Sequence, residues 1–237
     1  MVLIVINLIF KLVGIVNMSD EWLKMTACDL GRGIENSIID PLDLTEIYLK
    51  AASESQFKNR IYARLTEERA LREAEEASAR AKAKSRKGLL DGVPISWKDL
   101  FDTTGVATEA GTGLLKNRIP SEDAWVLKNA TAAGLVCLGK THMSELAFSG
   151  LGQNPMTETP PCVNDHDAVP GGSSSGAAAS VAFNIAAAGI GSDTGGSVRI
   201  PAAWNDLVGL KTTIGRLSVS GTVPLCPSFD TVGPLCR

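Results

Sequence analysis

Residues 170–202 contain Pro170-Gly-Gly-Ser-Ser-Ser-Gly176, an alanine-rich stretch, and then Gly191-Ser-Asp-Thr-Gly-Gly-Ser-Val-Arg-Ile-Pro-Ala202. These two serine–glycine turns flank a segment whose pattern predicts a buried helix followed by a short strand. Glycine runs cost backbone entropy and leave amide groups unpaired, so two of them around one apolar element indicate backbone directed at a ligand or a reacting atom. Each turn contains a serine, Ser173 in the first and Ser197 in the second, and both are candidate reacting groups.

Three common glycine motifs fail to account for this region. The segment 172–176 matches Gly-x-Ser-x-Gly with Ser174 at its centre, but a hydrolase of that type needs a histidine downstream, and both histidines lie upstream. The glycines at 189, 191 and 195 have the spacing Gly-x-Gly-x-x-x-Gly, which differs from the dinucleotide-binding pattern. No Gly-Lys-Ser/Thr follows the first glycines of this region, so the region is not a phosphate-binding P-loop.

A serine nucleophile without histidine needs another base, and a lysine can serve if its surroundings keep it neutral. Lys98 is the candidate, because it follows the apolar run Gly92-Val-Pro-Ile-Ser-Trp97 and so ends a buried strand, where lysine is unusual. A lysine that caps the strand through an ion pair with Asp99 or Asp102 is an alternative that the pattern leaves open.

The chain divides into three parts by composition. Residues 1–17 form an apolar extension that is too short to span a bilayer comfortably and lacks the basic start and cleavage site of a signal peptide. We interpret it as an upstream extension before a start at Met18, with a membrane anchor as the minority alternative. Residues 18–90 have a helical pattern and predict a helical arm, with one helix beginning at Pro41.

Residues 91–237 have a different texture, in which short apolar runs are separated by glycine and proline and alternate with helix-like stretches. This alternation predicts an α/β core. The apolar runs are 93–97, 135–138, 186–190 and 208–210, and the helix-like stretches include 121–133 and 176–187.

The composition is that of a globular protein, with 44% hydrophobic and 21% charged residues in a chain of 237. A net charge of −3 gives no general attraction to nucleic acid, and no aromatic residues are interleaved with a basic patch. The basic run at 80–87 is interpreted as a solvated helix end. A small, uncharged binding partner is therefore expected, with neither nucleic acid nor membrane as a direct partner.

The five cysteines are scattered, odd in number and without a Cys-x-x-Cys pair, which argues against both a disulfide framework and a zinc site. We therefore predict a reducing compartment and a cytoplasmic location. Two histidines, His142 and His166, are too few for most histidine-based metal sites. No metal and no cofactor are predicted.

Four segments, in this order, resemble the amidase signature family: Gly92-Val-Pro-Ile-Ser-Trp-Lys-Asp99, Gly139-Lys-Thr-His-Met-Ser-Glu-Leu146, Pro170-Gly-Gly-Ser-Ser-Ser-Gly176 and Gly191-Ser-Asp-Thr-Gly-Gly-Ser-Val-Arg199. The spacings between Lys98, Ser173 and Ser197 also fit that family. The resemblance runs from about Glu21 to the last residue. It implies a mixed β-sheet core flanked by helices.

The resemblance also implies a mechanism. Ser197 would attack the amide carbonyl, Ser173 would relay its proton, and Lys98 would be the final base, so that an acyl-enzyme forms and is hydrolysed. Lys98 must then be neutral, and desolvation would have to lower its pKa from about 10.4. The family pattern places a non-proline cis peptide bond before Ser173.

By the same resemblance, four backbone amides would form an oxyanion hole, namely those of Thr194, Gly195, Gly196 and Ser197. Asp193 and Arg199 would support the nucleophile's turn through polar contacts, Gly172 and Ser174 would support the other turn, and His142 would lie outside the reacting groups.

Family members are about twice as long as this chain, which implies the N-terminal half of the fold and an incomplete sheet. Edge strands and apolar faces would then be exposed unless a C-terminal half or a second copy covers them. The expected function is hydrolysis of a small carboxylic amide. The alternatives are a glutaminase-type amidotransferase subunit that acts with a partner on charged transfer RNA, and a non-catalytic domain on the same scaffold.

Overall fold

The computed structural model describes residues 20–237, so the predicted extension over 1–17 lies outside the described residues. Within this range, no helix combines the length and the apolar character that a bilayer crossing requires.

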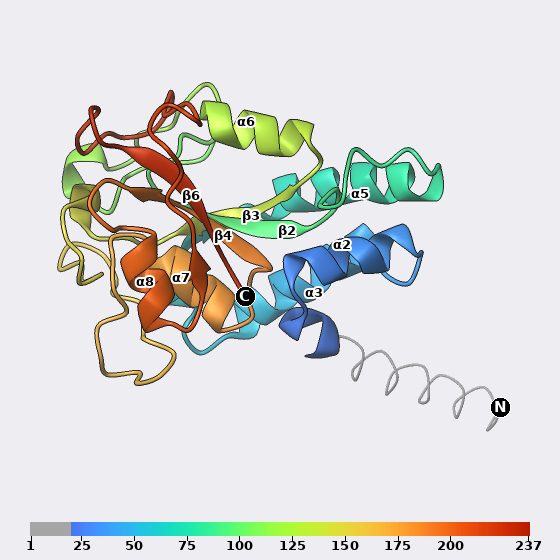
Figure 1. The fold of residues 1–237 in the computed structure, drawn as a ribbon, viewed down its shortest axis with the longest axis horizontal. Coiled ribbons are helices and arrows are strands. Elements are labelled where there is room, and N and C mark those ends of the chain that lie inside the picture. The colour runs from blue at the N-terminus through green and yellow to red at the C-terminus, as the bar shows by residue number, and fades with distance from the viewer. Residues whose placement is uncertain (1–19) are drawn as a thin grey trace.

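A six-stranded mixed sheet, in the order β1-β3-β2-β4-β6-β5, forms the centre of the fold (Figure 1). Strand β2 runs parallel to β3 and to β4, whereas the remaining neighbours pair antiparallel. The sheet is open, and its edges are β1 and β5, which confirms the predicted mixed α/β architecture. The strands are β1 (Tyr62–Leu65), β2 (Pro94–Lys98), β3 (Val136–Thr141), β4 (Ala188–Asp193), β5 (Val208–Gly209) and β6 (Thr231–Cys236).

Helices cover both sides of this sheet, with α6 on one side and α7 and α8 on the other in the view of Figure 1. They are α2 (Ala27–Glu35), α3 (Pro41–Glu54), α4 (Lys58–Ile61), α5 (Glu67–Lys82), α6 (Trp125–Ala132), α7 (Ser175–Ala182) and α8 (Arg199–Trp204). Helix α3 begins at Pro41, as predicted, because the Asp40 side chain accepts a hydrogen bond from the Leu42 amide at 2.9 Å and proline suits the first helical position.

The segment predicted as a helical arm differs from that prediction in two ways. It contributes the edge strand β1, which lies between two helices. With only four residues, this strand is too short to show an alternating pattern in the sequence. The segment's apolar residues also share one core with the sheet, where Leu44 and Tyr48 of α3 belong to the same buried cluster as Ile95 and Trp97 of β2. The segment is therefore part of the α/β core.

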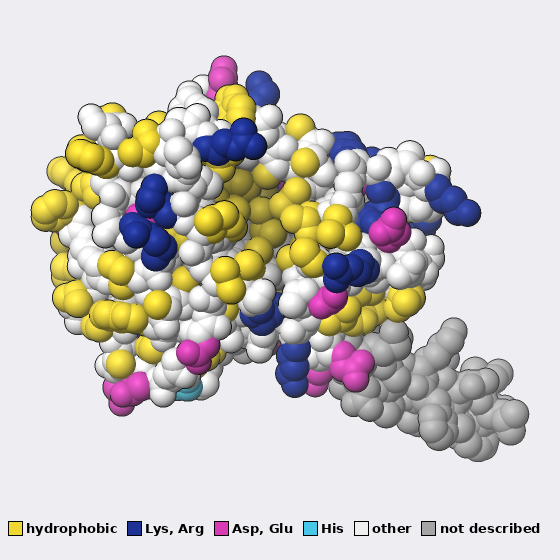
Figure 2. Space-filling model, in the orientation of Figure 1, with side chains coloured by type: hydrophobic (Ala, Val, Ile, Leu, Met, Phe, Trp, Pro, Cys, Tyr) yellow, Lys and Arg dark blue, Asp and Glu magenta, His cyan; other side chains and the backbone are white. Residues whose placement is uncertain are grey.

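Apolar side chains of the edge strand β5 and of the segment between β5 and β6 are exposed, as the open sheet predicts. Val208, Leu210, Ile214 and Phe229 are all more than half exposed. Figure 2 shows hydrophobic side chains gathered around a hollow in this view of the molecule.

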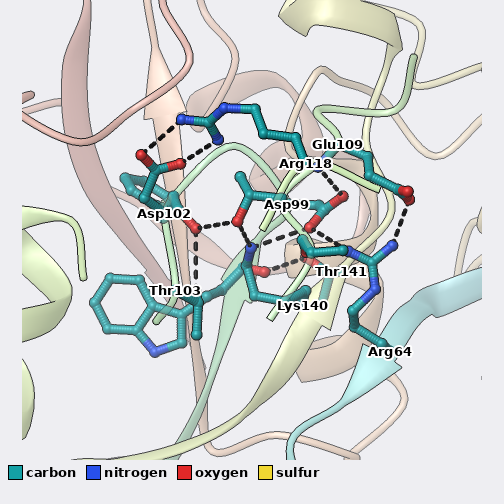
Figure 3. A network of polar contacts seen from close by, with 12 residues as sticks. Arg64, Asp99, Asp102, Thr103, Glu109, Arg118, Lys140 and Thr141 are labelled. Carbon is teal, nitrogen blue, oxygen red and sulfur yellow. Dashed lines mark hydrogen bonds and ion pairs between the residues drawn. The ribbon is translucent and has the colours of Figure 1, made fainter. Parts of the chain in front are cut away.

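A buried ionic network ties β1, β2 and β3 together beside the end of β2 (Figure 3). Lys140 on β3 is fully buried and donates to Asp99 and to the Thr108 hydroxyl, both at 3.0 Å. Arg64 on β1 bonds the same Asp99 carboxylate at 3.3 Å and the Glu109 carboxylate at 2.5 Å. Burial lowers the pKa of Lys140, and the Asp99 carboxylate opposes that shift.

We expect Lys140→Met to lower the free energy of unfolding by about 3–5 kcal/mol, because it leaves Asp99 without its buried amino partner. Urea unfolding at pH 7 measures the change. Lys50→Met is the matched control, since the Lys50–Glu54 pair is exposed and should contribute less than about 1 kcal/mol. Equal losses in the two variants would contradict the role given to burial.

Candidate active site

The three residues expected to react come from three different elements that converge at the carboxyl ends of the central strands β2 and β4. Lys98 is the last residue of β2, and Ser197 lies in the turn between β4 and α8. Because β2 and β4 are parallel neighbours, their carboxyl ends lie side by side, the usual position of a site in an open α/β sheet. Ser173 lies in the loop that leads into α7, the helix packed on β4.

Lys98 is fully buried and its amino group contacts two hydroxyl groups. The Nζ atom donates to Ser173 Oγ at 2.7 Å and to Ser192 Oγ at 2.8 Å. The sequence pattern did not identify Ser192 as a partner of Lys98, although this serine belongs to the quoted Gly191–Ala202 segment. Only the pairing of β4 beside β2 shows that this hydroxyl faces the lysine.

The alternative in which Lys98 forms an ion pair with a nearby carboxylate is not what the structure shows. Asp99 is bound by Lys140 and Arg64, and Asp102 forms two hydrogen bonds with Arg118 at 2.6 and 2.9 Å (Figure 3). Neither carboxylate contacts the Lys98 amino group, whose partners are the hydroxyl groups of Ser173 and Ser192.

Burial therefore dominates the ionisation of Lys98. Desolvation lowers its pKa from 10.5 to about 7, while the negative charges of Asp193 and Asp230 oppose this shift. A lysine with a pKa near neutrality can accept and return a proton, which an ordinary lysine rarely does at pH 7.

The turn before α7 is shaped by glycine and by backbone hydrogen bonds. The Gly172–Ser173 peptide bond is cis, as the family resemblance implies. A Cβ atom at Gly172 would lie 2.5 Å from the Gly152 nitrogen, so no larger residue fits there without displacing the backbone. The Ser174 amide donates to the Ser197 carbonyl oxygen at 3.1 Å, which joins the two serine–glycine turns.

Asp193 organises the turn that carries Ser197. Its carboxylate accepts the Gly196 amide at 2.8 Å and the Val198 amide at 3.1 Å. The Arg199 guanidinium adds two hydrogen bonds at 3.0 and 2.9 Å. Burial alone would raise the pKa of Asp193, but these donors hold it below its usual range. Asp193 and Arg199 thus bond each other, and Asp193 also bonds the backbone of the turn.

Of the four amides predicted to form an oxyanion hole, one already has an acceptor and three do not. The Gly196 amide donates to Asp193, so it is already occupied. The amides of Thr194, Gly195 and Ser197 make no hydrogen bond within residues 20–237. Ser197 itself is 8% exposed, and its hydroxyl group has no hydrogen-bond partner among the described residues. The site therefore offers three amides and a free hydroxyl group.

The two glycines of this turn face different surroundings. Gly196 has a φ of +132° and a Cβ atom there would lie 2.7 Å from Ile200 Cδ1, whereas a Cβ at Gly195 would meet nothing within 4 Å. Gly195 therefore borders open space and also carries one of the three amides without an acceptor.

We expect Gly195→Ala to change the free energy of unfolding by less than about 0.5 kcal/mol, yet to slow acylation of Ser197, because its methyl group would fill the approach to the amides. Gly196→Ala should instead destabilise the fold by about 1–3 kcal/mol, since its positive φ disfavours a side chain. Urea unfolding and the rate of active-site labelling measure the two effects. Equal stability losses would contradict this assignment.

The two histidines lie outside the reacting group. His142 is buried, burial lowers its pKa, and its carbonyl oxygen accepts the Gly176 amide at 2.9 Å at the start of α7. The His166 ring packs against Phe57 with ring centroids 4.8 Å apart. Within residues 20–237, no group of three or more His, Cys, Asp or Glu side chains could hold a metal ion.

The open mixed sheet, with a buried lysine bonded to a serine beside a glycine-rich turn, is the arrangement that the resemblance to the amidase signature family implies. The sequence model of the family described as Amidase matches residues 43–237. The chain belongs to this family, which confirms the resemblance found in the sequence.

Relatives with curated names include the A subunit of glutamyl-tRNA(Gln) amidotransferase from Acinetobacter baumannii, 40% identical over 216 residues. The alignment covers 90% of this chain and 43% of that relative. The subunit of the same name from Anaeromyxobacter dehalogenans is 41% identical over 219 residues, which cover 92% of this chain and 44% of the relative. The chain thus spans less than half the length of these relatives.

Solved structures in the family have the same fold. The peptide amidase from Stenotrophomonas maltophilia aligns with a TM-score of 0.84 at 34% identity, over 90% of this chain and 45% of that protein. An amidase family protein from Bacillus anthracis aligns with a TM-score of 0.85 at 30% identity, over 94% of this chain and 46% of that protein.

Proposed function

We propose that this chain carries the reacting half of an amidase, which hydrolyses a carboxylic amide through an acyl-enzyme on Ser197. The observation that carries the proposal is the fully buried amino group of Lys98, hydrogen-bonded to Ser173 at the same end of the central strands as the free Ser197 hydroxyl. Membership of the amidase family supports this reaction class.

The first half of the reaction uses each group once. Ser197 Oγ attacks the amide carbonyl carbon, and its proton passes through Ser173 to the neutral amino group of Lys98. The amides of Thr194, Gly195 and Ser197 would stabilise the oxyanion that develops. When the C–N bond breaks, Lys98 returns the proton through Ser173 to the leaving nitrogen. An amine or ammonia leaves, and an ester to Ser197 remains.

The second half repeats this chemistry with water as the nucleophile. Lys98 is neutral again after the first product leaves, so it can take a proton from water through Ser173. Hydroxide adds to the ester carbonyl carbon, the bond to Ser197 breaks, and the serine recovers its proton. The product is a carboxylate, and no cofactor is consumed. Small linear amides and peptide amides are both in the proposed substrate class.

The pKa of Lys98 is what makes this sequence of steps feasible near neutrality. At a reference pKa of about 10.4, roughly one lysine in 2,500 would be neutral at pH 7. At the value of about 7 that burial gives Lys98, about half of the molecules hold the neutral base at pH 7.

A glutaminase subunit of an amidotransferase is the second candidate, because curated relatives at 40% and 41% identity carry the name of such a subunit. The amide would then be glutamine, and the ammonia would pass to a partner protein that acts on charged transfer RNA. Glutamine hydrolysis that depends on the partner subunits would favour this candidate. Hydrolysis of simple amides by the chain alone would favour the first.

Intact-mass labelling of the purified chain with a fluorophosphonate probe tests the proposal. A single adduct that maps to Ser197 is expected, since the probe reacts with an activated serine next to an oxyanion hole. A folded chain that acquires no adduct would favour the third alternative, a non-catalytic domain on the amidase scaffold. A cytoplasmic location stays a prediction from the cysteine pattern.

A further inference from the structure

A carboxylate outside the predicted site contacts the turn that carries Ser197. Asp230 lies directly before β6, and its Oδ1 atom accepts a hydrogen bond from Thr194 Oγ1 at 2.5 Å. The same carboxylate accepts the backbone amides of Leu225 and Cys226, both at 3.0 Å. Asp230 therefore joins the loop at 225–230 to the first residue after β4.

Thr194 is the position where this contact affects the proposed chemistry. Its amide is one of the three that have no acceptor within the described part of the chain. The next two residues are glycines and have no side chain to anchor the backbone. The turn is thus fixed from two sides, by Asp193 on its Gly196 side and by Asp230 on its Thr194 side.

We propose that Asp230 is a positioning residue for amide hydrolysis, which acts through the Thr194 hydroxyl group to orient the amides that receive the oxyanion. This inference rests on the proposed function. Asp230 touches none of the reacting groups, so its effect on the reaction passes through Thr194 and through its charge.

The charge of Asp230 also reaches Lys98. Two carboxylates raise the pKa of the lysine against the effect of burial, first Asp193 from β4 and then Asp230. The other groups that contact the lysine amino group are the neutral hydroxyls of Ser173 and Ser192. Removing the Asp230 charge should therefore lower the pKa of Lys98.

A purely structural role is the competing explanation, because Asp230 also caps the loop at Leu225 and Cys226. Asp230→Asn separates the two roles, since its side-chain oxygen can still accept those amides while the negative charge is lost. Thr194→Val removes the hydroxyl group and leaves the charge in place. Thr194→Ser restores the hydroxyl group without the methyl group.

The test measures the second-order rate of fluorophosphonate labelling at Ser197 between pH 5 and pH 9. In the wild type, the rate should rise with pH as Lys98 loses its proton and then reach a plateau. We expect Thr194→Val to lower the plateau about tenfold or more without moving the pH of the rise, and Thr194→Ser to recover most of that loss. Asp230→Asn should lower the plateau and also shift the rise to lower pH.

Wild-type plateaus in both Thr194→Val and Asp230→Asn would overturn the inference, as would a Thr194→Ser variant as slow as Thr194→Val. A rise at the wild-type pH in Asp230→Asn would overturn the effect of its charge. If Asp230→Asn does not fold, the Thr194 pair decides, because Thr194 is only half-buried and we expect both of its variants to fold. Failure of the proposed function looks different, since the wild-type chain itself would then acquire no adduct at Ser197.

Discussion

Ser197→Ala should abolish the fluorophosphonate adduct and lower amide hydrolysis by at least about 1,000-fold, because it removes the atom that forms the acyl bond. The Ser197 hydroxyl has no hydrogen-bond partner among residues 20–237, so its loss should leave the fold intact. Intact mass spectrometry after labelling, and product release from an amide substrate, measure the effect.

Ser173→Ala is expected to lower labelling and amide hydrolysis by nearly the same factor as Ser197→Ala, since the losses from residues that act as one unit do not add. It breaks the path between Ser197 and Lys98, which depends on the 2.7 Å bond from the lysine to Ser173. Ser53→Ala, on the exposed side of α3, is the control and should label like the wild type. An adduct of normal yield in Ser197→Ala would place the nucleophile elsewhere.

Lys98→Met should lower labelling and hydrolysis by a similar factor and remove their dependence on pH near neutrality. In the wild type, both should rise as pH increases through about 7, because the neutral amino group is the base. Rate profiles between pH 5 and pH 9 for the two proteins measure this. A rise near pH 7 that persists in Lys98→Met would assign the ionisation to another group.

The same substitution should increase stability. The folded pKa of Lys98 is about 7, below its ordinary 10.5, so between these values the unfolded chain binds a proton that the folded chain does not. Stability therefore rises with pH across this window, and the penalty of burial is fully present below pH 7. Each unit of the shift corresponds to about 1.4 kcal/mol, so Lys98→Met should gain several kcal/mol at pH 7 in urea unfolding.

Lys140→Met should have the opposite effect on stability, although both lysines are fully buried on neighbouring strands. Lys140 pairs with a carboxylate, whereas among residues 20–237 the Lys98 amino group contacts only hydroxyl groups. Burying the Lys98 amino group without a carboxylate partner lowers the stability of the fold. The same missing partner keeps this amino group neutral at pH 7, as a base must be. Two destabilising methionine variants would contradict this distinction.

Several elements could be predicted from local pattern alone. The apolar runs predicted β2, β3, β4 and β5 within a few residues, and the helix-like stretches predicted α6 and α7. Strand β6 was missed because Gly233 and Pro234 interrupt its sequence, and proline usually breaks a strand. In the structure, β6 pairs with β4 over six residue pairs, and the Pro234 carbonyl oxygen still accepts the Leu210 amide.

The sequence by itself determined the α/β class and the family, and it singled out Lys98, Ser173 and Ser197 as candidates, because these depend on motifs whose residues lie close together along the chain. Tertiary structure decided which groups surround them. The contacts of Lys98 with Ser192, of Thr194 with Asp230 and of Lys140 with Asp99 each join segments far apart in the sequence, and only strand pairing brings them together. Burial also depends on that packing. The chemistry requires a low pKa at Lys98, but only the folded arrangement of the strands removes its amino group from water and so produces that pKa.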